Sequence, residues 1–400
     1  MTTHKWAFAS RFRRNAFGWK SSLPIQRLKE AVSEIRQAAR TDQALAAEGA
    51  ILLLEKLSPA LEHVDSSSGA MGSAVNRVIT TLVPLIAQAD VEPSLRQRWL
   101  DRLFEALQED RMPYIESLGD NWGELCSTPT IASSWADRLL PLTAHVLGPD
   151  GQGAHFVGTT ACLSALYAAR RYDELIALVD SARLTIWWYR RWAIDALVAL
   201  GRTAEALRYA EASRRPNAPE GAIAQACEAI LLASGMKDEA YRRYAIAANR
   251  NTTNLATFRG IAKKYPERTP ASIIVDLVAS EPGSEGKWFA AAKDAGLFDL
   301  AISLARNSPT DPRTLTRAAR DFAQKRPDFA MACALTALHW ISAGYGYEIT
   351  GIDVLNAYAA LTEAATAGGM SPDEVNGRVR EQISDDRSFV SRVLAQQLSG

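Results

Sequence analysis

Apolar residues along this chain recur at helical spacing in almost every window. In residues 24–40, one face of the expected helix carries Ile25, Leu28, Val32 and Ile35. Alternating runs of β-branched residues, which would indicate strands, are not found in the sequence. We therefore expect an all-α protein. The expected helices cover 24–40, 44–57, 70–89, 95–108 and 133–147, and near the end of the chain 353–366 and 373–398, the last one broken near 385–386.

A short pattern recurs within residues 154–343. It consists of a helix end, a glycine, three linking residues, and a Glu-Ala pair or its equivalent that opens a second helix. The segments 197–207, 231–241 and 292–302 carry the pattern with its glycine, and 168–176 and 322–331 carry it without. Aligned on the glycine, the turns fall at positions 170, 201, 235, 296 and 325. One further turn is expected near 264–268, where Pro270 stands in place of the alanine.

This pattern has a simple physical basis. Glycine ends a helix readily because it adopts positive φ without steric cost. An early alanine in the next helix lets the two helices approach closely. One such hairpin cannot bury its apolar face alone, so neighbouring hairpins must stack on it. The sequence therefore predicts a solenoid of stacked helical hairpins.

The segment 199–210, Ala-Leu-Gly-Arg-Thr-Ala-Glu-Ala-Leu-Arg-Tyr-Ala, resembles the turn and second helix of a tetratricopeptide (TPR) repeat. The resemblance extends over 154–343 in degenerate form, because the early tryptophan and the closing proline of that repeat do not recur. It implies a TPR-like, right-handed α-α superhelix. The whole chain also resembles a group of bacterial helical-repeat proteins without an assigned activity, through segments 5–13, 285–293 and 344–350.

Four segments are expected from these patterns. Residues 1–23 form a cationic, aromatic N-terminal arm, and 24–148 form an N-terminal helical region. The repeat array follows at 154–343, after the glycine-rich break at 148–153, and residues 344–400 form a helical C-terminal cap. Terminal units of a solenoid are usually atypical because they shield its last apolar face.

Composition narrows the function. The 45 basic and 45 acidic residues cancel, which argues against a uniformly basic nucleic-acid binder. The four cysteines form no CxxC pair and the five histidines share no metal-ligand spacing, so no metal and no cofactor are expected. No run of apolar residues is long enough for a transmembrane segment and the N-terminus lacks a secretory signal, so we expect a cytoplasmic protein.

The first candidate binding feature is the N-terminal arm. Residues 1–29 carry seven basic residues and no acid, interleaved with five aromatics. This mixture can stack on bases while neutralising phosphates, lie on an anionic membrane, or bind a protein. Alternatively, the aromatics pack on the first helices and the arginines pair with acids. The candidate residues are Arg11, Arg13, Arg14 and Trp19.

The second candidate is an aromatic and arginine cluster that comprises Trp187, Trp188, Tyr189, Arg190, Arg191 and Trp192. These residue types dominate the energetics of protein interfaces. The alternative is that the aromatics fill the seam between two repeats. If Trp187 or Arg191 instead faces the concave surface, it marks a peptide or nucleotide groove.

No catalytic constellation is found, so the leading hypothesis is a non-enzymatic α-helical repeat protein that serves as a protein–protein interaction scaffold or adaptor. One alternative is a nucleic-acid-binding α-solenoid that uses the basic aromatic arm. The other is an enzyme on an all-α scaffold. The identity of a protein or peptide partner and the oligomeric state are left open by the sequence.

Overall fold

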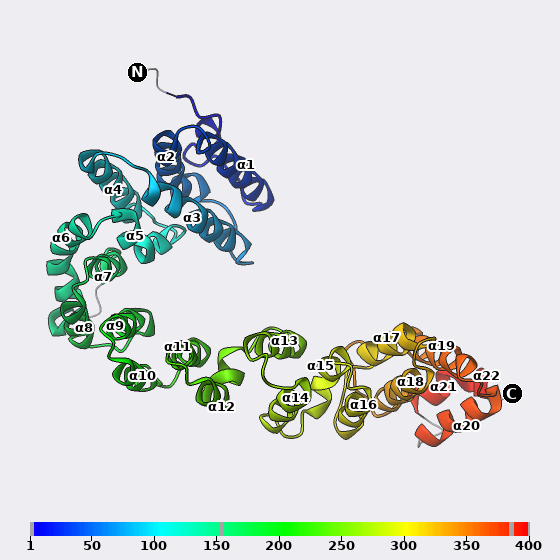
Figure 1. Ribbon diagram of the computed structural model, residues 1–400. Coiled ribbons are helices and arrows are strands. Elements are labelled where there is room, and N and C mark those ends of the chain that lie inside the picture. Colours follow the sequence, from blue (N-terminus) through cyan, green and yellow to red (C-terminus); the bar gives the residue numbers. More distant parts are fainter. Residues whose placement is uncertain (1–3, 152–154, 384–387, 399–400) are drawn as a thin grey trace. The chain divides into compact units, whose positions relative to one another are not determined.

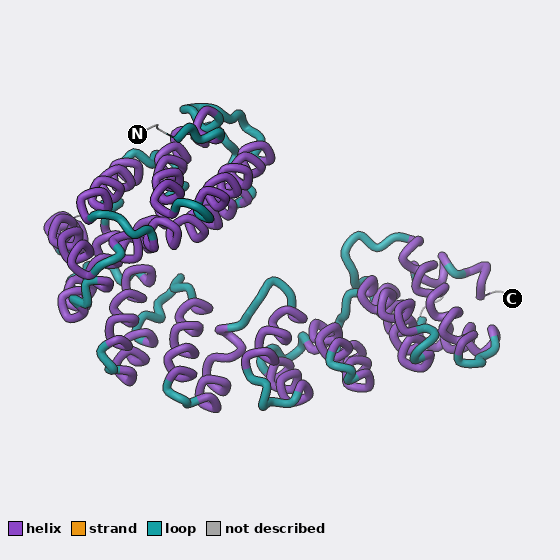
Figure 2. The backbone as a smooth tube through the Cα atoms, turned by 45° about the horizontal axis from the view of Figure 1, so that its top comes forward, coloured by secondary structure: helices purple, strands orange, loops and turns teal. Residues whose placement is uncertain are grey.

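The computed structural model describes residues 4–151, 155–383 and 388–398, and throughout these residues the chain forms helices and no strand (Figures 1 and 2). The expected all-α class is therefore confirmed for the described residues. The chain divides into two compact units, residues 1–219 and 220–400. The glycine-rich break at 148–153 lies inside the first unit, and its residues 152 and 153 are outside the described part. The four-segment division stays a prediction.

The described part of the first unit contains ten α-helices and three 3-10 helices. They are η1 (Phe8–Ser10), α1 (Ser22–Ala38), α2 (Gln43–Leu61), α3 (Ala70–Gln88), α4 (Pro93–Gln108), η2 (Glu116–Asn121), α5 (Trp122–Cys126), α6 (Pro129–Leu147), η3 (Pro149–Gly151), α7 (Thr159–Ala168), α8 (Tyr172–Asp180), α9 (Trp187–Ala199) and α10 (Thr203–Glu211). The short elements η2 and α5 were not expected from the sequence. They are too brief to show helical periodicity.

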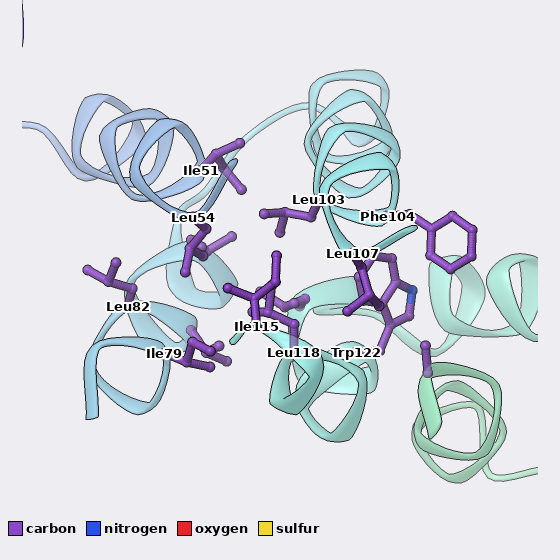
Figure 3. Packing of buried hydrophobic residues seen from close by; sticks show 14 of the residues in the cluster. Ile51, Leu54, Ile79, Leu82, Leu103, Phe104, Leu107, Ile115, Leu118 and Trp122 are labelled. Atoms are coloured by element: carbon purple, nitrogen blue, oxygen red, sulfur yellow. The ribbon is translucent and has the colours of Figure 1, made fainter. Parts of the chain in front are cut away.

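The core of this unit is built from α2, α3 and α4 with η2 and α5. Figure 3 shows the side chains that meet there, among them Ile51, Leu54, Ile79, Leu82, Leu103, Leu107 and Trp122. Trp122 and Trp135 of α6 make an edge-to-face contact with ring centroids 5.0 Å apart, and both are fully buried. Aromatic residues bury the largest apolar areas, so this pair anchors α6 to the core.

Local signals in the sequence explain where these helices begin and end. Asp42 caps α2 by accepting the amide N–H of Leu45 at 2.8 Å. Proline at the first position opens α4 and α6, where no backbone donor is needed. The buried Arg96 closes α3 by donating to the carbonyl oxygens of Ile86, Ala87 and Ala89.

The described part of the second unit contains twelve α-helices and one 3-10 helix. They are α11 (Glu220–Ala233), α12 (Lys237–Ala248), α13 (Asn254–Lys264), α14 (Pro270–Ala279), η4 (Glu285–Trp288), α15 (Phe289–Asp294), α16 (Phe298–Asn307), α17 (Pro312–Phe322), α18 (Pro327–Ser342), α19 (Gly351–Ala367), α20 (Pro372–Gln382), α21 (Phe389–Val393) and α22 (Ala395–Leu398). Helices adjacent in sequence contact one another from α11 to α16, and α17 contacts α18. The region expected as a helix over 373–398 contains α20, α21 and α22, and the break expected near 385–386 lies outside the described residues.

Six helices end at the same kind of corner. One residue adopts positive φ, and the residue after it donates its N–H to the carbonyl five positions back, at 2.8–3.0 Å. The positive-φ residues are Arg170, Gly201, Gly235, Gly296, Gly344 and Gly369. Four of them are turns that the repeat pattern placed. The expected turn at 325 closes differently, because Arg326 donates to the carbonyl of Phe322 at 2.9 Å.

Within the described residues, α3 is the one helix long and apolar enough to cross a membrane by length and composition. Core helices of proteins without any membrane span pass the same test. The face of α3 that includes Val75, Ile79 and Leu82 is packed in the core, and the middle of the helix carries Arg77. Part of its apolar surface is therefore buried within the first unit.

Candidate binding groove between α1 and α3

The two acidic side chains of helix α1, Glu30 and Glu34, contact the N-terminal arm. Glu30 pairs with Arg11 and with Arg27, at 2.6 Å each. Glu34 accepts the backbone N–H groups of Ala7 and Phe8 at 2.7 and 3.1 Å. The acids of α1 are thus used to hold the N-terminal arm, and neighbouring arginines hold the pKa of Glu30 below its ordinary value.

The arm itself packs on the first helices. Trp6, Phe8, Phe12 and Phe17 are all buried. The indole of Trp6 lies against Gly49 of α2, where a Cβ atom would stand 2.3 Å from ring atom Cζ2. Because glycine has no Cβ, this position leaves room for the indole ring. The arm is therefore a fixed part of the first unit.

On its other side, α1 forms one wall of an open groove whose opposite wall is α3. Its volume is about 450 Å³. The lining residues are Ile25, Leu28, Lys29, Val32, Ser33, Arg36, Gln37 and Arg40 on the α1 side, and Ala74, Arg77, Val78 and Thr81 on α3. The α1 side therefore contributes a residue at every turn from position 25 to position 40.

The floor of the groove is apolar. Leu28 and, from α3, Ala74 and Val78 are buried, whereas Ile25 and Val32 are only half-buried. These last two side chains keep apolar surface in contact with solvent. Covering such surface is favourable by about 25 cal/mol for each Å² removed from water.

The rim of the groove is basic. Lys29, Arg36, Arg40 and Arg77 are all exposed, and the lining contains no acidic residue. None of these four cations forms an ion pair with another residue in the described part of the chain. The groove therefore combines an apolar floor with four cations whose charge is not balanced by a local acid.

The candidate residues of the arm lie outside this groove. Arg11 is paired with Glu30, and Arg13 donates to the backbone carbonyl of Ser10 at 3.1 Å. Arg14 and Trp19 are exposed, and the Trp19 side chain is 72% accessible to solvent. Of the five aromatics of the arm, Trp19 is therefore the one that remains open to a partner.

The aromatic and arginine cluster at the start of α9 is divided between interior and surface. Trp187 is buried, and Trp188 is 57% exposed. Arg190 stacks on the ring of Tyr209 at 3.6 Å and donates to Ser213 Oγ at 2.7 Å. Arg191 forms an ion pair with Asp120, and the ring of Trp192 contacts the ring of Tyr167. Tyr189 is half-buried.

These contacts assign most of the cluster to packing within the first unit. The exposed Trp188 and the paired Arg191 line a depression of about 360 Å³, together with Asp120, His155 and Tyr189. Because Asp120 already neutralises Arg191, this depression offers a ligand less uncompensated charge than the α1–α3 groove does.

Among the described residues, no group of three or more His, Cys, Asp or Glu side chains is placed to hold a metal ion. All four cysteines are buried. Burial raises the pKa of the Cys126 and Cys333 thiols to about 12, so these thiols are protonated at neutral pH.

The basic rim was not identified from the sequence, although part of its signal is present there. Lys29, Arg36 and Arg40 follow one another at spacings of seven and four residues, which places them along one side of the first helix. Arg77 is the single charged residue in 70–88. What the sequence does not show is that α3 lies beside α1 and completes the groove.

Comparison with known protein families and with curated proteins gives no match for this chain.

Proposed function

We propose that this protein is a non-enzymatic α-helical repeat protein that acts as an interaction scaffold and binds a segment of another protein in the α1–α3 groove. The observation that carries the proposal is the groove itself, with half-buried Ile25 and Val32 on its floor and four unpaired cations on its rim. A concave apolar site with a few polar groups around it is the usual form of a binding site.

The second unit supports the same role. Its hairpins α11–α12, α13–α14 and α15–α16 follow one another in sequence order, with contacts between neighbours. We propose that this succession is a TPR-like solenoid, as the resemblance of 199–210 implies. Solenoids of this kind usually hold partners on extended surfaces.

The lining of the groove favours binding over catalysis. It holds no histidine, cysteine or carboxylate that could serve as a general base or a nucleophile. Its polar groups are four cations, two hydroxyls and one amide. Such a set can orient an anionic partner but cannot by itself move a proton at neutral pH.

The nucleic-acid alternative now depends on fewer groups. It relied on aromatics interleaved with cations in the arm, and four of the five aromatics are buried. Trp19 is the exposed aromatic left for base stacking, and Lys5, Arg13, Arg14 and Lys20 are exposed for phosphate contacts. We therefore propose protein binding as the function.

A selection from a displayed library of random 16-residue peptides tests the proposal with the full-length protein as target. We expect enriched peptides that lose binding when Val32→Asp places a charge on the groove floor. Val275→Asp serves as the matched control, since Val275 is an exposed valine on α14 of the second unit and does not line the groove. A selection that enriches nothing, or enriches only peptides indifferent to Val32→Asp, would refute the proposal.

A further inference from the structure

We infer that the ligand of the α1–α3 groove is an acidic amphipathic helix of the partner protein. The inference rests on the proposed function and adds the conformation and the charge of what is bound. It is carried by three properties of the groove: its length along α1, the nature of its walls and the sign of its rim.

The groove is long and follows a helix axis. Helix α1 lines it from Ile25 to Gln37 and the turn after the helix adds Arg40, so at a rise of about 1.5 Å per residue the stretch measures roughly 22 Å. A compact metabolite would use only part of that length. A helix of four turns matches it, and its ridge of side chains fits between the ridges of two neighbouring helices.

The walls favour a helical ligand over an extended one. Both walls are α-helices, and their backbone N–H and C=O groups are bonded within the helices themselves. An extended peptide would therefore find no backbone edge to pair with. A helix satisfies its own backbone groups and needs from the groove only side-chain contacts, which Ile25, Val32 and Val78 provide.

The rim determines the charge of the ligand. Lys29 and Arg77 belong to opposite walls, and Arg36 and Arg40 continue the basic side toward the end of α1. A basic or neutral helix would leave these four cations unbalanced, whereas glutamate and aspartate beside its apolar stripe would face them. Charge complementarity of this kind mainly sets specificity and the rate of association.

Two other anionic partners fit the groove less well. No aromatic side chain lines it, so the bases of a nucleic acid would have nothing on which to stack. Ile25 and Val32 are half-buried whereas the four cations are exposed, so a flat bilayer surface would meet the cations more readily than the apolar floor. A protruding ridge of leucines on a helix reaches that floor.

Defined peptides test the inference by fluorescence anisotropy with the full-length protein. The probe is a labelled 16-residue peptide with leucines at helical i, i+3 and i+4 spacing and glutamates at the remaining positions. The first comparison peptide replaces every glutamate by lysine, and the second carries two central prolines that break the helix. We expect the acidic helical peptide to bind at least about tenfold more tightly than either, with affinity that falls as salt screens the exposed charges.

Paired variants locate the binding. Arg36→Glu combined with Arg40→Glu should weaken binding of the acidic peptide by about tenfold or more, at a cost near 1.4 kcal/mol per tenfold change. Arg13→Glu combined with Arg14→Glu alters the same number of exposed arginines outside the groove and should leave binding unchanged. The lysine peptide should gain affinity for the Arg36/Arg40 reversal variant, a gain that an unfolded variant could not show.

The outcomes separate this inference from the proposed function. Equal binding of the lysine or proline peptide, or binding that survives the Arg36/Arg40 reversal, overturns the inference. The proposed function would stand in that case if library peptides still require Val32. Binding of phosphatidylglycerol vesicles or of a single-stranded oligonucleotide through Arg36 and Arg40, without binding of the acidic peptide, overturns it in favour of those partners.

Discussion

Replacing Gly49 by alanine should release the N-terminal arm. A Cβ atom at this position would lie 2.3 Å from Cζ2 of Trp6 and 2.6 Å from Cη2. Ordinary carbon–carbon contacts are about 3.5–4.0 Å, so the indole would have to move by more than about 1 Å. It cannot simply tilt away, because Glu34 holds the backbone N–H groups of Ala7 and Phe8.

The size of the effect follows from two opposing contributions. Losing a buried tryptophan from a core costs about 3–5 kcal/mol. Glycine in the middle of a helix is less favourable than alanine by about 1 kcal/mol, so the substitution also stabilises α2. We expect Gly49→Ala to lower the free energy of unfolding by about 2–4 kcal/mol, as the difference between these contributions.

A double-mutant cycle measures the coupling directly. Urea unfolding followed by far-ultraviolet circular dichroism would be recorded for wild type, Gly49→Ala, Trp6→Ala and the double variant. Without the indole, Gly49→Ala should change sign and stabilise by about 1 kcal/mol. Gly72→Ala on α3 is the matched control, because nothing lies within 4 Å of its added Cβ. It should leave stability unchanged or slightly higher.

Limited proteolysis gives a second, local measurement. The arm carries Arg13 and Arg14 beside the buried Phe12, and release of Trp6 should speed tryptic cleavage there without affecting α2. A Gly49→Ala protein that is more stable than wild type, with the arm still protected, would show that Trp6 is not seated on Gly49.

Three further predictions concern buried or paired charges. Glu228 is 1% exposed and accepts hydrogen bonds from Lys264, Tyr265 and Asn249. Glu228→Ala would leave these donors without their acceptor, so it should lower the free energy of unfolding by about 3 kcal/mol. A loss under about 1 kcal/mol in urea unfolding would contradict this prediction. Arg96→Met keeps the apolar part of the side chain but leaves the carbonyl groups at the end of α3 without their hydrogen-bond donor. Thermal unfolding should therefore show a loss of about 1–3 kcal/mol in the free energy of unfolding. An unchanged Tm would disprove the capping role of Arg96. Arg313 lowers the pKa of Asp353, so this ion pair should stabilise the protein above pH ~4, and the stabilisation should be lost as the pH falls further. The difference in Tm between wild type and Asp353→Asn should therefore shrink from pH 6 to pH 3. A difference in Tm that stays constant over this range would count against the prediction.

The helical class and most helix positions could be predicted from the sequence because they depend on local periodicity. The expected helix over 70–89 is found as Ala70–Gln88, and that over 95–108 as Pro93–Gln108. The turns at 201, 235 and 296 were placed because glycine at a helix end is a local signal. Position 170 shows the limit of that signal, since Arg170 takes the same positive φ without being glycine.

The turn near 264–268 was the hardest to place, and the structure gives the reason. Instead of a glycine corner, Tyr265 is fully buried and donates its hydroxyl to Glu228 at 2.7 Å. That contact joins residues 37 positions apart, and no short sequence pattern encodes it. The groove was missed for the same reason, because it exists only once α3 lies beside α1.

The six helix ends that close at a positive-φ residue bear on the order in which the chain folds. Each is closed by bonds between residues at most five positions apart, as at Gly235, and the helices that it joins are adjacent in sequence. Contacts this short in range form quickly, so the stretch 220–248 can pair soon after it leaves the ribosome. The arm behaves differently: Trp6 precedes Gly49 by 43 residues, so its indole can pack only after α2 has been synthesised.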